Sequence, residues 1–181
     1  MATSCMAEQS GRMNSKNKGN SFERKMANLL SERFEKKTGI KKAFRRNSDS
    51  GSFFGGTNQR RLETYDTEKA NLGDIICPHS FTYTVECKHY KSSPLFKNLM
   101  NQEIKQWDDW LQQAEQDSQN SGKKMMLIIK YNNIDEIAIL KEPVPDTYNL
   151  PYREYFVVNL KACLAQEDHV FFDDTDHAAV A

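Results

Sequence analysis

The chain has 181 residues, of which 28% are charged, and its formal net charge at pH 7 is zero. This length suits one domain with a sizeable core and excludes two full-sized domains. A membrane span needs about 18 apolar residues in a row, and neither such a run nor the apolar stretch of a signal peptide occurs. We therefore expect no membrane partner and a cytoplasmic or nucleoid-associated protein, or one of the host cytoplasm if it is viral. The four cysteines lack CxxC spacing, which argues against a zinc site.

The neutral average hides a basic segment near the N-terminus. From Arg12 to Arg46 there are twelve Lys or Arg residues against three acidic ones, a balance of +9. Salt screens the compensating acids beyond about 10 Å, so this segment can still neutralise the phosphates of a nucleic acid. The alternative is an ordinary solvated helix face followed by a charged loop.

The first third of the chain predicts an arm, a helix and a long loop. Residues 1–17 are polar and aperiodic, and we expect a disordered arm. Apolar residues at helical spacing predict a helix from Ser21 to Lys37, with Gly39 ending it. A short basic strand over Lys41–Arg46 follows. Residues 47–72 carry no core pattern and indicate a long loop inserted into the domain.

The remainder predicts strands and helices of an α/β fold. Strands over Asp74–Cys77 and Phe81–His89 are joined by three residues, which favours an antiparallel hairpin. A helix over Asn98–Gln119 would bury Ile104, Trp107, Leu111 and Ala114. Further elements are expected as strands over Met125–Tyr131, Glu136–Leu140 and Tyr155–Val158 and a helix over 160–165. This order predicts a central mixed sheet flanked by helices, in one domain over 18–166 with an acidic flexible tail at 167–181.

Four polar residues point to chemistry: Glu23, Asp74, Glu86 and Lys88. Side chains two apart in a strand share a face, so Glu86 and Lys88 lie together. Folding the hairpin about residues 79 and 80 pairs residue 75 with 84 and brings Asp74 near residue 85 or 86, about 5 Å across. Asp74 and Glu86 could then grip one ion between them.

Carboxylate oxygens of this kind suit Mg²⁺, or Mn²⁺ in its place, and such an ion would activate a water for hydrolysis of a phosphodiester. We expect the cation to lower the pKa of Lys88, which could then orient or help deprotonate the attacking water. Each residue also has a structural alternative. Asn20 and Glu23 fit a helix capping box, Asp74 a turn, and Glu86 with Lys88 a solvent-facing charge pair.

In this order the motifs resemble those of the PD-(D/E)XK nuclease superfamily, and most closely those of archaeal-type Holliday junction resolvases. The matching motifs are Lys18-Gly19-x-x-x-Glu23-Arg24, Arg45-Arg46, Ser50-Gly51-Ser52, Asp74-Ile75-Ile76 and Glu86-Cys87-Lys88. The resemblance covers about residues 18–140. One departure is Gly73, which replaces the proline that often precedes the aspartate and which we expect to matter little chemically. A second is the insertion at 53–72, and a third is the neutral net charge.

The resemblance implies a restriction-endonuclease-like fold, with Lys88 as the catalytic lysine. It implies metal ligands from Glu23, Asp74, Glu86 and the backbone carbonyl of Cys87. It also implies homodimers that cut DNA at four-way junctions.

Candidate DNA-binding residues lie in the basic segment and in the inserted loop. Phe53 and Phe54 could stack on unpaired bases, although packing on the domain or at a dimer seam is the alternative. The full set is Lys18, Arg24, Lys41, Lys42, Arg45, Arg46, Ser50, Ser52, Phe53, Phe54, Arg60 and Arg61.

Three functions remain open from the sequence. The first is a metal-dependent DNA endonuclease acting on branched DNA. The second is a related nuclease that cuts duplex, flapped or single-stranded DNA. The third is a catalytically inactive DNA-binding module with the same fold.

Overall fold

The structure, a computed structural model, describes residues 15–47 and 72–173, with side chains from residue 17. The parts of the chain at 1–14, 48–71 and 174–181 lie outside the described residues, as therefore do most of the expected arm, the inserted loop and the end of the tail. The described helices are α1 (Ser15–Arg33), α2 (Glu35–Thr38), α3 (Phe96–Met100), α4 (Lys105–Ser121), α5 (Leu160–Leu164) and the 3-10 turn η3 (Asp168–Val170). The strands are β1 (Arg45–Arg46), β2 (Ile75–Ile76), β3 (Tyr83–Tyr90), β4 (Lys124–Tyr131), β5 (Ile137–Leu140), β6 (Leu150–Tyr152) and β7 (Tyr155–Asn159).

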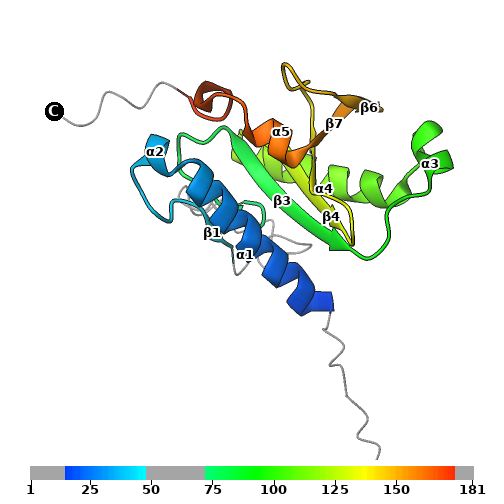
Figure 1. Cartoon of the computed structure of the whole chain (residues 1–181), viewed down its shortest axis with the longest axis horizontal. Coiled ribbons are helices and arrows are strands. Elements are labelled where there is room, and N and C mark those ends of the chain that lie inside the picture. The colour runs from blue at the N-terminus through cyan, green and yellow to red at the C-terminus, as the bar shows by residue number, and fades with distance from the viewer. Residues whose placement is uncertain (1–14, 48–71, 174–181) are drawn as a thin grey trace, which may run out of the picture.

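The described strands form one mixed sheet in the order β1-β2-β3-β4-β5-β7-β6. Strands β3 and β4 pair in parallel, and the other neighbours are antiparallel. Helix α1 crosses one face of β3 and α4 lies behind the sheet (Figure 1). The predicted α/β fold, a central mixed sheet flanked by helices, is confirmed.

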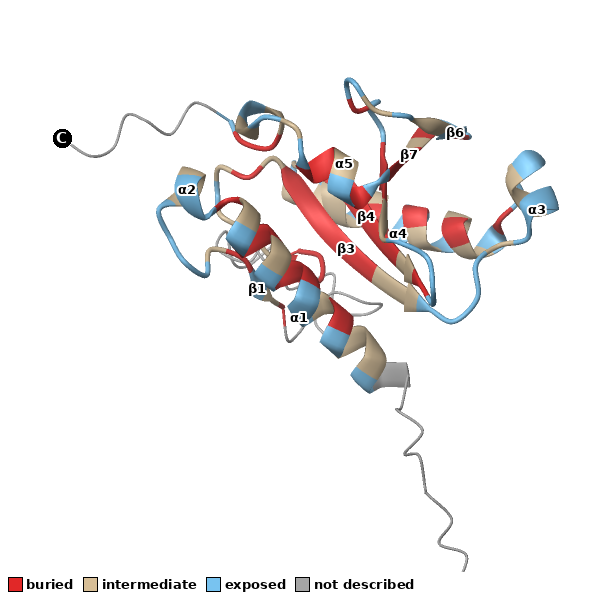
Figure 2. Cartoon of the chain, viewed as in Figure 1, coloured by how far each residue is buried: buried red, intermediate tan, exposed pale blue. Residues whose placement is uncertain are grey.

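Each face of the sheet has its own core, and β3 is buried along most of its length (Figure 2). Tyr83, Val85 and Cys87 pack on the side of α1 and α5. Thr84 and Glu86, the alternate residues, contact α4 instead through Ser121 and Gln113. This is the strand alternation that the sequence predicts for the two faces of β3.

The first helix begins earlier and ends earlier than the pattern predicts. Asn20 and Glu23 lie inside α1, so the capping-box alternative is wrong. The helix breaks at Phe34, whose fully buried ring packs against four other phenylalanines. The predicted stop is confirmed, because Gly39 caps α2 in a left-handed conformation with φ of 67°.

The predicted second helix is divided. Residues 101–104 separate α3 from α4, and the backbone N–H of Ile104 donates to the Tyr152 hydroxyl at 3.0 Å. The predicted buried stripe of Ile104, Trp107, Leu111 and Ala114 is confirmed. The edge strand β6 had no signal in the sequence, because it is three residues long and contains a proline.

The domain extends beyond residue 166. Phe171 and Phe172 are 0% and 3% exposed, and Phe172 forms a β-bridge with Phe81. Residues 168–173 are therefore part of the packed domain, contrary to the expected flexible tail from 167. The acidic neighbours of these two rings concealed their role, which is to complete the cluster around Phe34. Among the described residues, no helix is long and apolar enough to span a membrane.

Candidate active site

The predicted hairpin of β2 and β3 is confirmed, with Ile75 opposite Val85 rather than residue 84. The backbone N–H of Asp74 donates to the carbonyl of Val85 at 2.9 Å. In return, the backbone N–H of Cys87 donates to Oδ2 of Asp74 at 2.9 Å. The Asp74 side chain therefore lies along β3 at the level of Glu86 and Cys87, fixed in orientation by the strand.

Gly73 sets the path of the chain into Asp74. Its φ is +85°, and a Cβ there would lie 2.6 Å from the carbonyl oxygen of Val85. A proline cannot adopt this angle, because its ring holds φ near −65°. The replacement of proline by glycine, which we expected to matter little, is thus a conformational requirement of this hairpin. The buried Asn47 supports the same turn by donating to the Gly73 carbonyl at 3.0 Å.

Glu86 is the most deeply buried of the four candidate residues, at 2% exposed. The Lys88 ammonium donates to Oε1 of Glu86 at 2.6 Å and to the side-chain oxygen of Gln113 at 3.1 Å. The Gln113 amide also donates to Oε1 of Glu86, at 2.6 Å. Both donors use the same oxygen, so the second oxygen of Glu86 is engaged by neither. The buried carboxylate excludes the alternative of a solvent-facing charge pair.

The protonation of this pair follows from burial and from the neighbouring charges. Burial first and then the charge of Asp74 raise the pKa of Glu86, Lys88 partly offsets both, and the resulting pKa is about 8. Burial alone would lower the pKa of Lys88, but attraction to Glu86 and Asp74 outweighs burial and leaves that pKa raised. The lowered pKa expected for Lys88 is therefore not what the protein's own charges produce. The expectation counted repulsion from a cation and left out the attraction of Glu86.

Glu23 stands beside this pair on α1. Its Oε2 accepts from Nε of Arg46 at 2.5 Å, and Asn20 accepts from Nη2 of Arg46 at 2.9 Å. Burial raises the pKa of Glu23 and the charge of Asp74 raises it further, while Arg46 opposes both. Glu23 is thus within electrostatic reach of Asp74, although its carboxylate is bound to Arg46.

Asp74 and Glu86 are the candidate ligands that a divalent cation would have in this site. Within the described residues no three Asp, Glu, His or Cys side chains are grouped closely enough to hold a metal ion. Asp74 and Glu86, however, are both buried, and the charge of Asp74 disfavours ionisation of Glu86. A hard cation between their oxygens would relieve that repulsion, and carboxylate oxygens are its preferred ligands.

Two residues of α4 belong to the site and were missed from the sequence. Gln113 bridges Glu86 and Lys88. Asp117 lies one turn further along, where burial first and then the charge of Asp74 raise its pKa to about 6. The usable signal was that Gln113 and Asp117 are four residues apart and flank the buried Ala114. That spacing places both side chains on the same helix face.

The candidate DNA-binding residues fall into three groups. Arg24, Lys41, Lys42 and Arg45 have exposed side chains. Lys18 donates to Asn132 and Arg46 holds Glu23, so both have partners within the protein. The remaining candidates lie outside the described residues: Ser50, Ser52, Phe53, Phe54, Arg60 and Arg61.

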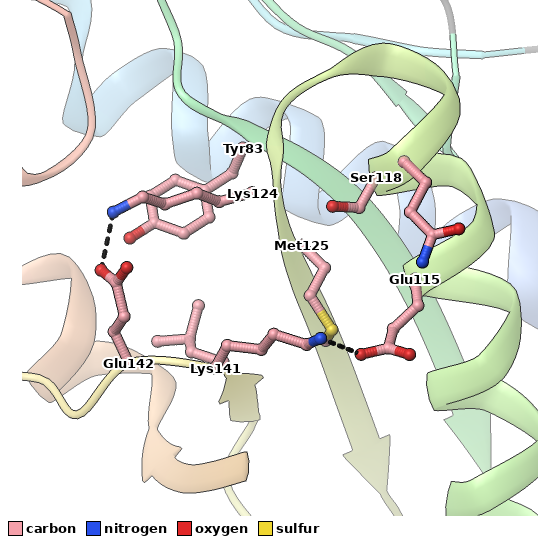
Figure 3. A pocket seen from close by; sticks show the side chains of 9 residues that line it. Tyr83, Glu115, Ser118, Lys124, Met125, Lys141 and Glu142 are labelled. Carbon is pink, nitrogen blue, oxygen red and sulfur yellow. Dashed lines mark hydrogen bonds and ion pairs between the residues drawn. The ribbon is translucent and has the colours of Figure 1, made fainter. Parts of the chain in front are cut away.

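A cavity of about 140 Å³ opens away from these residues, near the start of β4 (Figure 3). Two ion pairs line it, Lys124 with Glu142 at 2.6 Å and Lys141 with Glu115 at 2.5 Å. None of Glu23, Asp74, Glu86 and Lys88 lines this cavity. Because its charges are paired with one another, we do not assign the chemistry to it.

A protein-family model matches most of the chain. The model of one protein family, described as "Phage putative PDDEXK endonuclease", matches residues 14–174. Neither curated proteins nor solved structures match the chain. The matched range contains both strands of the hairpin, Glu23 on α1 and Gln113 on α4. The chain therefore belongs to this family of phage PDDEXK endonucleases, within the PD-(D/E)XK nuclease superfamily.

Proposed function

We propose that this protein is a metal-dependent DNA endonuclease that hydrolyses phosphodiester bonds and prefers branched DNA, such as a four-way junction. The observation that carries the proposal is the arrangement of the β2–β3 hairpin. It holds the buried carboxylates of Asp74 and Glu86 beside the ammonium of Lys88. Two carboxylates that can hold a metal ion, beside an ammonium that can stabilise charge on the phosphate, are suited to metal-assisted phosphodiester hydrolysis.

The metal ligands would be Asp74, Glu86 and the backbone carbonyl of Cys87, and the ion would be Mg²⁺, with Mn²⁺ as a substitute. When bound, the ion would supply a Lewis acid at the scissile phosphate. Glu23 would add negative charge from α1 if its carboxylate interacted with the ion as well as with Arg46. The paired carboxylates support a hard cation, because carboxylate oxygens are the ligands that Mg²⁺ and Mn²⁺ prefer.

Lys88 would act on the substrate directly. Its ammonium is held at 2.6 Å from Glu86 and by Gln113, so its position is set before DNA binds. A cation fixed in this way stabilises the charge that develops on the phosphate without having to reorganise. It can also orient the attacking water by donating a hydrogen bond. Gln113 would serve as a positioning residue for Lys88 and Glu86.

DNA binding is supported by exposed basic side chains in the N-terminal part, whereas the preference for branched DNA rests on the resemblance of the motifs to those of junction resolvases. Four exposed side chains are available to contact phosphates: Arg24 on α1, Lys41 and Lys42 before β1, and Arg45 in β1. A homodimer would place two such sites on opposite strands of a junction. Duplex, flapped and single-stranded DNA are the competing substrates.

The test is a cleavage assay with labelled four-way junction, flap, single-stranded and linear duplex DNA, with Mg²⁺ or with EDTA. We expect paired nicks in the junction that depend on Mg²⁺. Lys88→Ala should reduce the rate by about 10² to 10³ or more, the usual cost of removing a group that stabilises developing charge.

Lys124→Ala is the matched control, because Lys124 is a strand lysine on β4 whose partner, Glu142, lies outside the site. It should cleave like the unmodified protein. Equal cleavage by Lys88→Ala and Lys124→Ala would overturn the assigned role of Lys88. If the unmodified protein binds DNA but cleaves none of the four substrates, the inactive module is supported. If it cleaves flaps in preference to junctions, the alternative substrate is supported.

A further inference from the structure

The catalytic face of β3 continues into an aromatic pair. Glu86, Lys88 and Tyr90 alternate along the strand and therefore share a face. Tyr90 is 50% exposed, and its ring centroid lies 5.5 Å from that of Trp110 on α4. Trp110 precedes Gln113 by one helical turn. The same strand and helix thus meet twice, through Lys88 and Gln113 and then through Tyr90 and Trp110.

The connection after Tyr90 exposes further apolar side chains. Leu95, Phe96 and Met100 are 65%, 75% and 66% exposed, and α3 stands out as an exposed element (Figure 2). Single exposed apolar residues are ordinary, but several along one short segment indicate a surface that binds something. This segment leads directly from the strand that carries Lys88.

The charge of the segment favours a polyanion as the partner. Residues 87–102 contain three lysines and no acidic residue. Two of them, Lys91 and Lys97, have exposed side chains. Two acids near the start of α4 are held in ion pairs, Asp108 with Arg153 and Asp109 with Lys105. Exposed aromatic rings between lysines are the usual composition of surfaces that bind single-stranded nucleic acid.

We infer that Tyr90 and Trp110 form a stacking surface for unpaired nucleobases next to the scissile phosphate. This inference rests on the proposed function and adds that at least one nucleotide beside the cleaved bond is unpaired in the bound DNA, as at a flap or at a four-way junction opened at its centre. In a duplex the bases stack on one another and their faces are covered, so only an unpaired base offers a face to these rings. Lys91 and Lys97 would contact the backbone of the same strand.

The test measures binding apart from cleavage, in an Asp74→Asn background that we expect to keep the fold and not to cut DNA. Anisotropy of a labelled oligothymidylate and of a labelled duplex of equal length is compared for Tyr90→Ala and Tyr90→Phe. We expect Tyr90→Ala to weaken single-strand binding about tenfold, within the range for loss of one stacked base. Tyr90→Phe should retain affinity, because it keeps the ring, and duplex binding should stay within about twofold for both variants.

Tyr148→Ala is the control, since Tyr148 is 79% exposed and precedes the edge strand β6, remote from β3 in the sheet. Equal single-strand affinity of Tyr90→Ala and Tyr148→Ala would overturn the inference, as would an equal loss of duplex binding by Tyr90→Ala. Sedimentation velocity tests whether the surface of Tyr90 and Trp110 instead binds a second copy of this chain. If Tyr90→Ala converts a dimer into a monomer with unchanged single-strand affinity, the surface is a dimer contact and the inference is wrong. Failure to cleave any DNA with Mg²⁺ would refute the proposed function, whereas the binding result stands independently of it.

Discussion

A single backbone conformation at Gly73 positions the aspartate of the site. The residue has φ of +85°, which L side chains rarely adopt, and its Cα faces the Val85 carbonyl of the adjacent strand. Gly39 has a similar φ of +67°, but a Cβ there would meet nothing within 4 Å. Substitutions at the two glycines therefore separate the free-energy cost of the left-handed backbone angle from the cost of a steric clash.

We expect Gly73→Ala to reduce the free energy of unfolding by about 3 kcal/mol, from left-handed strain together with backbone displacement, and Gly39→Ala by about 1 kcal/mol. Urea denaturation of both variants measures the difference. Gly73→Ala should also lose cleavage, because any shift of the hairpin moves Asp74. Equal losses of stability would show that the close approach to Val85 is relaxed at no cost.

At the scale of elements, the C-terminal segment is joined to α1 by one arginine. Arg33 donates to the carbonyls of Leu164 and Gln166, each at 2.6 Å, and to the carboxylate of Asp168 at 2.8 Å. The guanidinium also lies 4.6 Å from the ring centre of Phe34. These hydrogen bonds from one guanidinium hold the residues beyond α5 against the domain.

Arg33→Met should lower the free energy of unfolding by about 2 to 3 kcal/mol, since it leaves two partly buried carbonyls without donors. Lys25→Met, on the same helix, removes only the solvent-exposed pair with Glu136 and should cost at most about 1 kcal/mol. Chemical denaturation compares the two. A loss for Arg33→Met no larger than for Lys25→Met would mean that α5 and η3 are held by their apolar side chains alone.

For the molecule as a whole, the site links stability to pH and to divalent cations. The folded pKa of Glu86 is raised to about 8 from an ordinary 4.5. Without a cation, the protonated carboxyl of Glu86 makes its full contribution to the free energy of unfolding below about pH 4.5. That contribution is lost as pH rises towards about 8. Lys88, whose pKa is raised above 10.5, stays charged across this window and does not alter the trend.

A cation competes with the proton for the Glu86 carboxylate. The stabilisation by a cation should therefore increase with pH, whereas the stabilisation by the proton decreases with pH. We expect Mg²⁺ to raise Tm more at about pH 8.5 than at about pH 6. Glu86→Gln should raise Tm in EDTA at the higher pH, because it removes a buried charge, and should abolish the increase caused by Mg²⁺. Differential scanning calorimetry with and without Mg²⁺ checks this. A Mg²⁺ effect that is equal at both pH values, or that survives in Glu86→Gln, would exclude Glu86 as a ligand.

Local patterns were sufficient for the elements that carry the site. Period-two alternation predicts that Glu86 and Lys88 share one face of β3, and the short connection at 78–80 predicts the hairpin that brings Asp74 beside them. Helical spacing likewise predicts the buried stripe of α4. These inferences succeed because strand and helix geometry relate side chains that are close in sequence.

Contacts between distant segments were beyond local patterns. The bond from Gln113 to Glu86 joins residues 27 apart, and the pair of Arg46 with Glu23 joins residues 23 apart. In the sequence, Phe171 and Phe172 look like part of an acidic tail. In the structure, both rings pack against Phe34, which is distant in the chain.

The sequence alone thus determined the fold class, the family resemblance and the acids and lysine of the hairpin, because these depend on residue type and on short spacing. Only the tertiary structure decided how those groups are used. It buried Glu86, bound Glu23 to Arg46, raised the pKa of Lys88 and placed Tyr90 against Trp110. The physical reason is that burial, charge interaction and ring contact depend on which distant elements pack together, and no local spacing specifies that packing.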